Sequence, residues 1–205
     1  MMIQLDQVSF SYEPGRPVLD DISLCLKREQ PVALLGESGT GKTTLFRLLA
    51  GVLSPTEGRI VREPEKMRLA VQFQEDRLFG HLSVYENLKL VNSRLTREEA
   101  ETCLTELNLE KELLSEPVQT LSGGMKRRLS LARALLYPSD FLLLDEPFAG
   151  LDAHTRQAAR RAIRERRNGR GLFLVTHDGS DAEALDAQAF FLRDGRLAPS
   201  YKTGG

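Results

Sequence analysis

The sequence has almost no net charge, only two cysteines and no long apolar segment. Its 28 basic and 29 acidic side chains nearly cancel, so no whole-chain field favours nucleic acid or an anionic membrane. Cys25 and Cys103 are too few for a disulfide framework and have no neighbours at metal-ligand spacing, which suits a reducing cytosol. No window approaches the roughly 18 apolar residues of a spanning helix, and residues 1–12 lack a signal-peptide pattern. We therefore expect that the chain does not itself cross a membrane. If it acts at a membrane, a partner protein must hold it there.

The residues that are present suffice for one compact domain. A chain of 205 residues that is 41% hydrophobic and 28% charged can bury a core. The polar, glycine-ended segment Tyr201–Gly205 is expected to be a frayed tail. We therefore predict a single domain over residues 1–205.

The pattern of apolar residues predicts an α/β fold. Alternation in Ile3–Phe10 and Ile22–Leu26 indicates two antiparallel strands that form an edge layer. After them, short apolar strands alternate with helices, as in a mostly parallel sheet. The strands expected in this sheet are Val32–Leu35, Leu69–Phe73, Phe141–Leu144 and Gly171–Thr176, followed by a hairpin of Ala189–Arg193 and Arg196–Ala198.

The β pattern disappears between Gln74 and Leu121, where a helical lobe is expected. Its predicted helices are Val84–Val91, Arg97–Leu107 and Lys111–Leu114, with Met125–Leu136 after them. The sequence thus divides into a core of residues 1–74 and 136–200 and an inserted lobe of residues 75–135.

The segment after the strand Val32–Leu35 matches the phosphate-binding pattern GxxxxGK[ST]. It follows a strand and opens the helix Lys42–Ala50, which is the context that the pattern requires. Glycines let successive N–H groups approach a phosphate, and the helix N-terminus adds its dipole. Lys42 is expected to reach the β- and γ-phosphates, and the Thr43 hydroxyl to ligate Mg²⁺. The predicted nucleotide-binding residues are Gly36, Glu37, Ser38, Gly39, Thr40, Gly41, Lys42, Thr43 and Thr44.

Two carboxylates end the apolar strand Phe141–Leu144. Asp145 lies at the C-terminal strand end, where doubly wound sheets place ligand groups, and is expected to hold Mg²⁺ directly or through water. Glu146 would point its carboxylate at the γ-phosphate, placed to orient or deprotonate an attacking water. This pair downstream of a phosphate loop predicts nucleotide hydrolysis.

A second glycine pair precedes the helix Met125–Leu136. Ser122 offers an N-cap hydroxyl, and Gly123 and Gly124 offer bare N–H groups at a positive helix end. Because the phosphate loop already cradles one nucleotide, this second anion site makes sense if it faces a nucleotide held by another subunit.

In order and spacing, these motifs resemble the nucleotide-binding subunit of ATP-binding-cassette (ABC) transporters over nearly the whole chain. The resemblance implies that Tyr12 stacks on adenine and that Gln74 touches Mg²⁺ and water and senses a membrane partner. Gln72 is the alternative to Gln74, which fits better because an apolar residue precedes it and Glu-Asp follows. One departure is Met125, where the family usually has glutamine, so a side-chain contact to the nucleotide at this position is in question.

The same resemblance assigns two further residues. Asp152, in Gly150–Asp152, would belong to a loop that crosses a dimer interface, and His177 would be the switch histidine that contacts the γ-phosphate. His81 and His154 lack such neighbours and are expected to be structural or exposed.

Basic residues cluster at 126–128 and along a later helix, which taken alone could suggest a nucleic-acid surface. The near-neutral total and the acidic neighbours Glu165 and Asp152 favour a solvated helix face instead. The later arginines are Arg156, Arg160, Arg161, Arg164, Arg166 and Arg167.

The resemblance implies an ATPase that closes as a head-to-tail homodimer around two ATP molecules with Mg²⁺. Its other partners would be integral membrane permease subunits and an extracytoplasmic solute-binding protein, placing it at the cytoplasmic face of a bacterial membrane, without nucleic acid. The segments Glu146–Phe148 and Phe73–Leu78 look most like importers of the nitrate, sulfonate, taurine and thiamine-precursor type. A small exporter for haem or lipid, a soluble cassette ATPase acting on DNA or ribosomes, and a nucleotide switch without hydrolysis are the alternatives.

Overall fold

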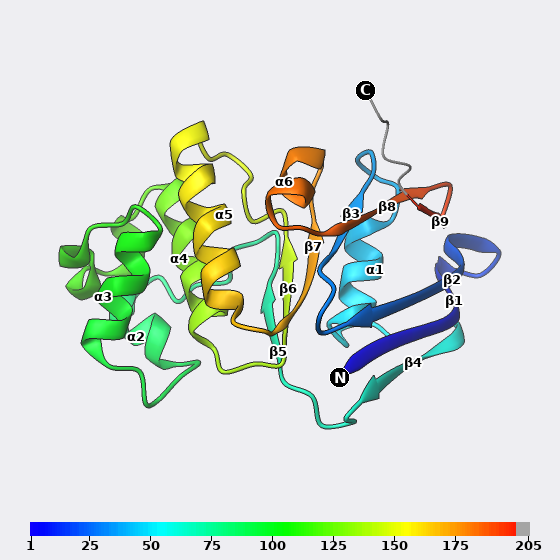
Figure 1. The fold of residues 1–205 in the computed structure, drawn as a ribbon, viewed down its shortest axis with the longest axis horizontal. Helices are drawn as coiled ribbons and strands as arrows, with labels where there is room; N and C mark the ends of the chain where they lie inside the picture. The colour runs from blue at the N-terminus through cyan, green and yellow to red at the C-terminus, as the bar shows by residue number, and fades with distance from the viewer. Residues whose placement is uncertain (200–205) are drawn as a thin grey trace.

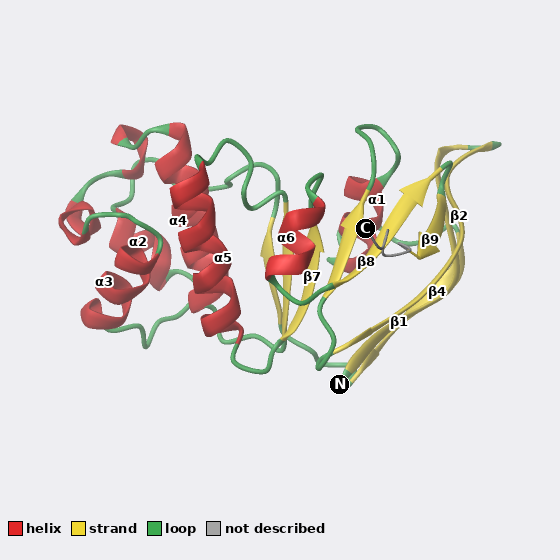
Figure 2. Cartoon of the chain, turned by 45° about the horizontal axis from the view of Figure 1, so that its top comes forward, coloured by secondary structure: helices red, strands yellow, loops and turns green. Residues whose placement is uncertain are grey.

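The structure is a computed structural model that describes residues 1–199, and it contains two β-sheets with helices on both sides of the larger one (Figures 1 and 2). The predicted α/β fold is therefore confirmed. The segment Tyr201–Gly205, expected to be a frayed tail, lies outside the described residues. Among the helices within residues 1–199, none combines the length and apolar character needed to span a bilayer.

The smaller sheet is antiparallel and has the strand order β2-β1-β4. Its strands are β1 (Met2–Glu13), β2 (Arg16–Lys27) and β4 (Glu57–Glu63). The first two confirm the predicted antiparallel pair. Strand β4 was not predicted, because a strand at the sheet edge with several charged side chains has no apolar alternation to reveal it.

The larger sheet has the order β5-β6-β7-β3-β8-β9, in which only β9 runs antiparallel to its neighbour. Its strands are β3 (Val32–Leu35), β5 (Leu69–Gln72), β6 (Phe141–Asp145), β7 (Gly171–Val175), β8 (Gln188–Arg193) and β9 (Arg196–Pro199). The three central strands are buried at every residue because both faces of the sheet are covered. The predicted strands and the final hairpin are confirmed.

Helix α1 (Lys42–Leu49) lies between the two sheets (Figure 1). Its apolar residues Leu45, Phe46, Leu48 and Leu49 share one core with strands of both sheets. This position fixes the start of α1, and with it the phosphate loop, beside the carboxyl ends of the parallel strands.

The other face of the larger sheet packs against α4 (Gly123–Leu136) and α5 (Ala153–Arg167), and one core runs from there into the helical segment beyond (Figure 2). That segment contains α2 (Val84–Lys89) and α3 (Arg97–Glu106), as predicted. The residues expected to form a helix at Lys111–Leu114 form a short 3₁₀ helix, Lys111–Ser115, and a second one, Val118–Thr120, was not foreseen.

The first residues of α2, α3 and α6 (Gly179–Ala184) are set by capping side chains in the sequence. Ser83 and Glu86 form a reciprocal capping box at α2, and Thr96 and Glu99 form another at α3. Helix α6, which follows β7, starts at Asp178, whose side chain accepts a hydrogen bond from the Ser180 amide.

Most arginines of α5 bind acidic side chains of other elements, and the expectation of a solvated helix face is wrong for Arg156, Arg160 and Arg166, whose side chains are each 22% exposed. Their partners lie in α6, in the segment around it and in α3, not at Glu165 or Asp152, because the folded chain brings those elements against α5. The ion pairs are Arg156–Asp178, Arg156–Asp181, Arg160–Asp181, Arg164–Asp186 and Arg166–Glu106.

Candidate nucleotide-binding site

The phosphate loop leaves β3 and enters α1 with backbone angles that its glycines permit. Gly36 has φ 152°, and a Cβ there would lie 2.7 Å from the Leu192 carbonyl oxygen. Gly41 has φ 102° and precedes α1 without any side-chain cap, so the first N–H groups of the helix keep no side-chain partner there. A helix start of this kind binds anions such as phosphate.

The Lys42 side chain folds back onto this loop. Its Nζ donates hydrogen bonds of 2.7 Å to the carbonyls of Gly36 and Glu37, and the Thr40 hydroxyl donates one of 2.9 Å to the Glu37 carbonyl. The ammonium group and the loop N–H groups therefore concentrate positive charge at one small region.

A cavity of about 470 Å³ opens beside the loop, and six separate chain segments line it. They come from the end of β1, from β2, from the loop and α1, from the turn after β5, and from the ends of β6 and β7. This is the edge where doubly wound sheets bind ligands. The lining residues are Tyr12, Val18, Ser38, Gly39, Gly41, Lys42, Thr43, Thr44, Gln74, Asp145, Glu146 and Val175.

The structure thus brings most of the predicted site residues together. The contribution of Val18 and Val175 to the cavity wall was not predicted, because a single valine in a strand carries no signal of its own. The predicted residues Gly36, Glu37 and Thr40 belong to the loop but do not line the cavity.

Asp145 lies at the base of the cavity and is only 2% exposed. Burial raises the pKa of its carboxyl to about 6, and the neighbouring carboxylate of Glu146 adds to the rise, while Lys42 and two arginines oppose it. The negative charge of this buried carboxylate is not fully balanced by the nearby basic side chains. It therefore favours the binding of a cation at this end of the cavity.

Glu146 and His177 form a direct contact across neighbouring strand ends. The Glu146 carboxylate lies 2.9 Å from His177 Nδ1, and the glutamate side chain is 17% exposed whereas the histidine is 64% exposed. An ionised Glu146 carboxylate can only accept this hydrogen bond, and Nδ1 is then the donor. Glu146 also has φ 49°, a strained angle for a non-glycine residue that is common at functional sites.

The two candidate glutamines differ in burial and in their position relative to β5, because Gln72 ends the strand and Gln74 lies beyond it. Gln74 is exposed and lines the cavity, whereas Gln72 is 1% exposed on the face of β5 that it shares with Ala70, in the core that α4 joins. The geometry therefore favours Gln74. Neither amide atom of Gln72 has a hydrogen-bond partner among the described residues.

We expect Gln72→Met to raise the free energy of unfolding by about 1 to 2 kcal/mol, because it removes two buried polar atoms without partners at nearly constant volume. Urea denaturation monitored by circular dichroism measures the change. Gln74→Met is the matched control, an exposed position two residues later that should shift stability by less than about 0.5 kcal/mol. A clear loss of stability in Gln72→Met would contradict the assignment of an unpaired amide.

Tyr12 lies at the mouth of the cavity with much of its ring free. Its hydroxyl is 3.3 Å from the Thr44 Oγ1, its edge contacts Phe10 at a centroid distance of 4.8 Å, and the side chain remains exposed. A ring held in this way can stack on a planar base.

The residues 122–124 lie apart from this cavity, at the exposed start of α4, and are absent from its described lining. The Ser122 Oγ accepts a hydrogen bond of 3.3 Å from the Met125 amide, which confirms the predicted N-cap. Asp152 caps α5 in the same way, accepting hydrogen bonds from the Thr155 amide at 2.9 Å and hydroxyl at 2.8 Å. Both segments therefore present helix starts outside the cavity that the phosphate loop lines.

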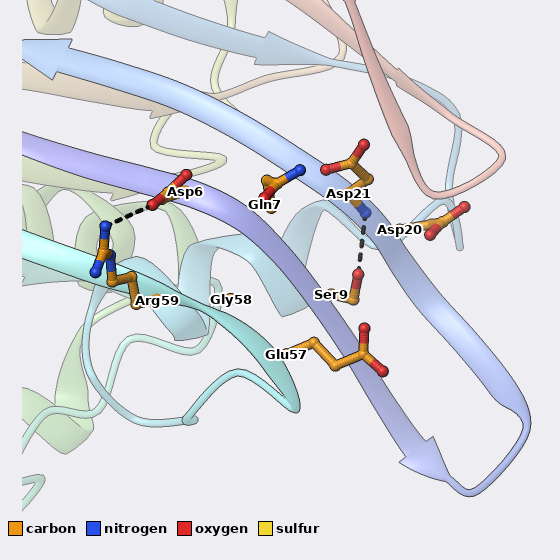
Figure 3. A pocket seen from close by; sticks show the side chains of 8 residues that line it. All are labelled: Asp6, Gln7, Ser9, Asp20, Asp21, Glu57, Gly58 and Arg59. Carbon is orange, nitrogen blue, oxygen red and sulfur yellow. Dashed lines mark hydrogen bonds and ion pairs between the residues drawn. The ribbon is translucent and has the colours of Figure 1, made fainter.

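A second cavity, of about 570 Å³, lies in the antiparallel sheet (Figure 3). Four of its eight lining residues are acidic, and two of its contacts hold the strands together, the Arg59–Asp6 ion pair and the hydrogen bond from the Asp21 amide to the Ser9 hydroxyl. None of the residues predicted for the nucleotide site lines it. The lining residues are Asp6, Gln7, Ser9, Asp20, Asp21, Glu57, Gly58 and Arg59.

Comparison with known proteins gives concordant matches in sequence and in fold. The family model described as "ABC transporter" matches residues 19–149. The aliphatic sulfonates import ATP-binding protein SsuB 1 of Streptomyces avermitilis is 41% identical over 98% of this chain and 76% of its own length. The molybdate/tungstate import ATP-binding protein WtpC of Pyrococcus abyssi is 36% identical over 96% of this chain and 61% of its own length.

Among solved structures, the dimeric bacterial ABC transporter cassette MJ0796 superposes with a TM-score of 0.86 and 25% identity, covering 99% of both chains. A second structure of the same cassette dimer, in a post-hydrolysis state bound to ADP and Pi, matches equally well. The phosphate loop, the carboxylates that end β6 and the separate helix start at 122–124 all lie on this shared fold, and the chain belongs to the ABC transporter family.

Proposed function

We propose that the chain is the ATP-binding and ATP-hydrolysing subunit of a membrane importer. The observation that carries the proposal is the split geometry of the site. The phosphate loop and Glu146 share one cavity, while the anion-binding helix start at residues 122–124 lies outside it on the same chain. The cavity contains the phosphate loop and Glu146 but lacks the helix start at residues 122–124. This arrangement suits two copies of the chain, each of which completes the nucleotide site of the other.

Within one copy, the proposed roles follow from position in the cavity or directly beside it. Tyr12 stacks on the base, the loop residues 36–44 hold the phosphates, and Lys42 neutralises their charge. Glu146 orients and deprotonates the attacking water, and His177, which contacts Glu146, faces the γ-phosphate. Gln74 senses the state of the site from the turn after β5.

The residues that face the cavity fit Mg²⁺. Within residues 1–199 no three His, Cys, Asp or Glu side chains come together as a ready-made metal site. Thr43, Gln74 and Asp145 instead offer a hydroxyl, an amide oxygen and one buried carboxylate, and Mg²⁺ typically combines such a small set with phosphate oxygens and water. When bound, Mg²⁺ neutralises the phosphates.

In the proposed homodimer, Ser122, Gly123 and Gly124 of each copy contact the nucleotide in the cavity of the other, and Asp152 lies in the segment that crosses the interface. Closure then depends on ATP, because only a nucleotide with a γ-phosphate reaches both copies. Hydrolysis breaks that bridge and opens the dimer. We assign the chain to one cassette domain, with a core of residues 1–74 and 136–200 and a helical lobe of residues 75–135 that passes the motion on.

Import is favoured over export because both relatives described above are named as import ATP-binding proteins. By this analogy the partners are integral membrane permease subunits, which hold the cassette at the cytoplasmic face of a bacterial membrane, and an extracytoplasmic solute-binding protein. A sulfonate or another small oxyanion is the cargo class that these relatives suggest.

The oligomeric state tests the shared site. Size-exclusion light scattering of Glu146→Gln should give a mass near 23.0 kDa with ADP and about twice that with ATP in the absence of Mg²⁺, because only ATP bridges the copies. Binding of a fluorescent ATP analogue is measured in parallel. A chain that binds ATP and stays monomeric at every concentration would contradict closure through shared nucleotides.

A further inference from the structure

Asp181 is a fully buried carboxylate in α6, four residues after His177, and it is bound by side chains of α5 and by Thr176. It is 0% exposed. Its Oδ1 accepts hydrogen bonds from Arg160 Nε at 2.8 Å and Nη2 at 2.6 Å, and its Oδ2 accepts one from Arg156 Nη2 at 2.9 Å. The cluster places two guanidinium groups from α5 against one carboxylate, and each of its oxygens accepts a charge-assisted hydrogen bond.

Asp181 also fixes the two residues that flank His177. The Thr176 hydroxyl donates a 2.5 Å hydrogen bond to Asp181 Oδ2 and accepts one of 3.2 Å from the Asp178 amide. Arg156 Nη1 binds the Asp178 carboxylate at 2.8 Å. The histidine therefore projects from a short backbone segment whose residues on both sides are bound to the Asp181 cluster.

The same arginines contact the segment that carries Glu146. The guanidinium carbons of Arg156 and Arg160 lie 5.8 and 5.9 Å from the ring centroid of Phe148, which is buried two residues after Glu146. The Arg156 amide, moreover, donates to the Asp152 carbonyl in the first turn of α5. Three segments thus meet around Asp181 and its two arginines. They are the segment after β6, the start of α5 and the segment after β7.

From this geometry we infer that Asp181 is a positioning residue that, through Thr176, Arg156 and Arg160, holds His177 in contact with Glu146. The inference rests on the proposed function for its consequence in hydrolysis, but the contact itself is measurable without nucleotide. Among the described residues, the Asp181 side chain is hydrogen-bonded to Thr176, Arg156 and Arg160 and not to His177, and it does not line the cavity, so its effect passes through the flanking backbone.

The contact is tested by NMR of the histidine side chains. The chain has three histidines, so ring ¹⁵N and ¹³Cε1 signals are assigned with His81→Gln and His154→Gln. In the native chain His177 should show the fixed tautomer with the proton on Nδ1. In Asp181→Asn and in Thr176→Val, which removes one hydroxyl and keeps both arginine pairs, the His177 signals should shift towards those of a freely exchanging imidazole.

The matched control is Asp186→Asn, which breaks the ion pair between Arg164 of α5 and Asp186, just after α6, at an exposed position. Asparagine tolerates the φ of 51° found there. It should leave all three histidine signals in place. Unchanged His177 signals in both Asp181→Asn and Thr176→Val would overturn the inference, whatever the ATPase activity.

Hydrolysis supplies the second readout. Below the melting temperature, Asp181→Asn should lower kcat about 10- to 100-fold with little change in the KM for ATP, as expected for a misplaced group. In the His177→Ala background the same substitution should change kcat less than about twofold, because the group it positions is gone. Additive losses would identify a general structural role and overturn the inference. A normal kcat in His177→Ala, with shifted NMR signals in Asp181→Asn, would instead contradict the proposed function and leave the positioning intact.

Discussion

Replacing Glu146 with glutamine is expected to lower kcat for ATP hydrolysis at least about 100-fold, the usual loss when a general base is removed. The amide cannot take a proton from water, but it has the same shape and can still accept the hydrogen bond from His177 Nδ1. The affinity for ATP should therefore stay within about threefold of the native value, since general-base catalysis acts on the chemical step. A coupled-enzyme ATPase assay and nucleotide titration measure the two quantities.

The control for this variant is Glu75→Gln, a neighbour of Gln74 whose exposed carboxylate pairs with Arg77 at 3.3 Å. It removes one negative charge close to the site without touching the cavity lining, and its kcat should match that of the native chain. If Glu146→Gln hydrolyses ATP normally, the base must be another group.

Two inactive variants are expected to restore each other's activity when they are mixed. Lys42→Ala removes the cation of the phosphate loop, and Gly124→Asp places a carboxylate at the start of α4, where it repels phosphate. A Cβ at Gly124 meets no atom within 4 Å, so this change leaves the fold intact. Each variant alone should lose nearly all hydrolysis, because every shared site in its homodimer is defective.

In the mixed dimer, one site combines both defects and the other combines two native halves. Random pairing makes half of the dimers mixed, so a 1:1 mixture should recover about a quarter of the native ATPase rate if the sites act independently. The ATPase assay of the mixture, at total protein equal to that of the native sample, measures this.

The matched control is a mixture of Lys42→Ala with Glu146→Gln. These two changes lie in the same half of the site, so every mixed dimer has one defect in each cavity and should stay inactive. No recovery in the test mixture would show that the two halves belong to one chain. Recovery in the control would show that Lys42 and Glu146 of one chain serve different sites.

The sequence by itself determined the parts of the site whose geometry is set within a few residues. The phosphate loop needs positive φ angles and an uncapped helix start, which the glycines at 36 and 41 supply in any α/β context. The Ser122 cap of α4 and the capping boxes of α2 and α3 are local in the same sense. The apolar runs of β3, β6 and β7 likewise follow from burial on both faces.

Only the tertiary structure decided which distant segments meet. It selected Gln74 over Gln72, because Gln72 is buried in β5 whereas Gln74, beyond the strand, lines the cavity. It also added the charged edge strand β4 and turned two arginines of α5 into ligands of Asp181. Such contacts join groups 20 or more residues apart, Arg160 and Asp181 among them. Their geometry comes from the packing of whole helices and strands, which no local sequence pattern specifies.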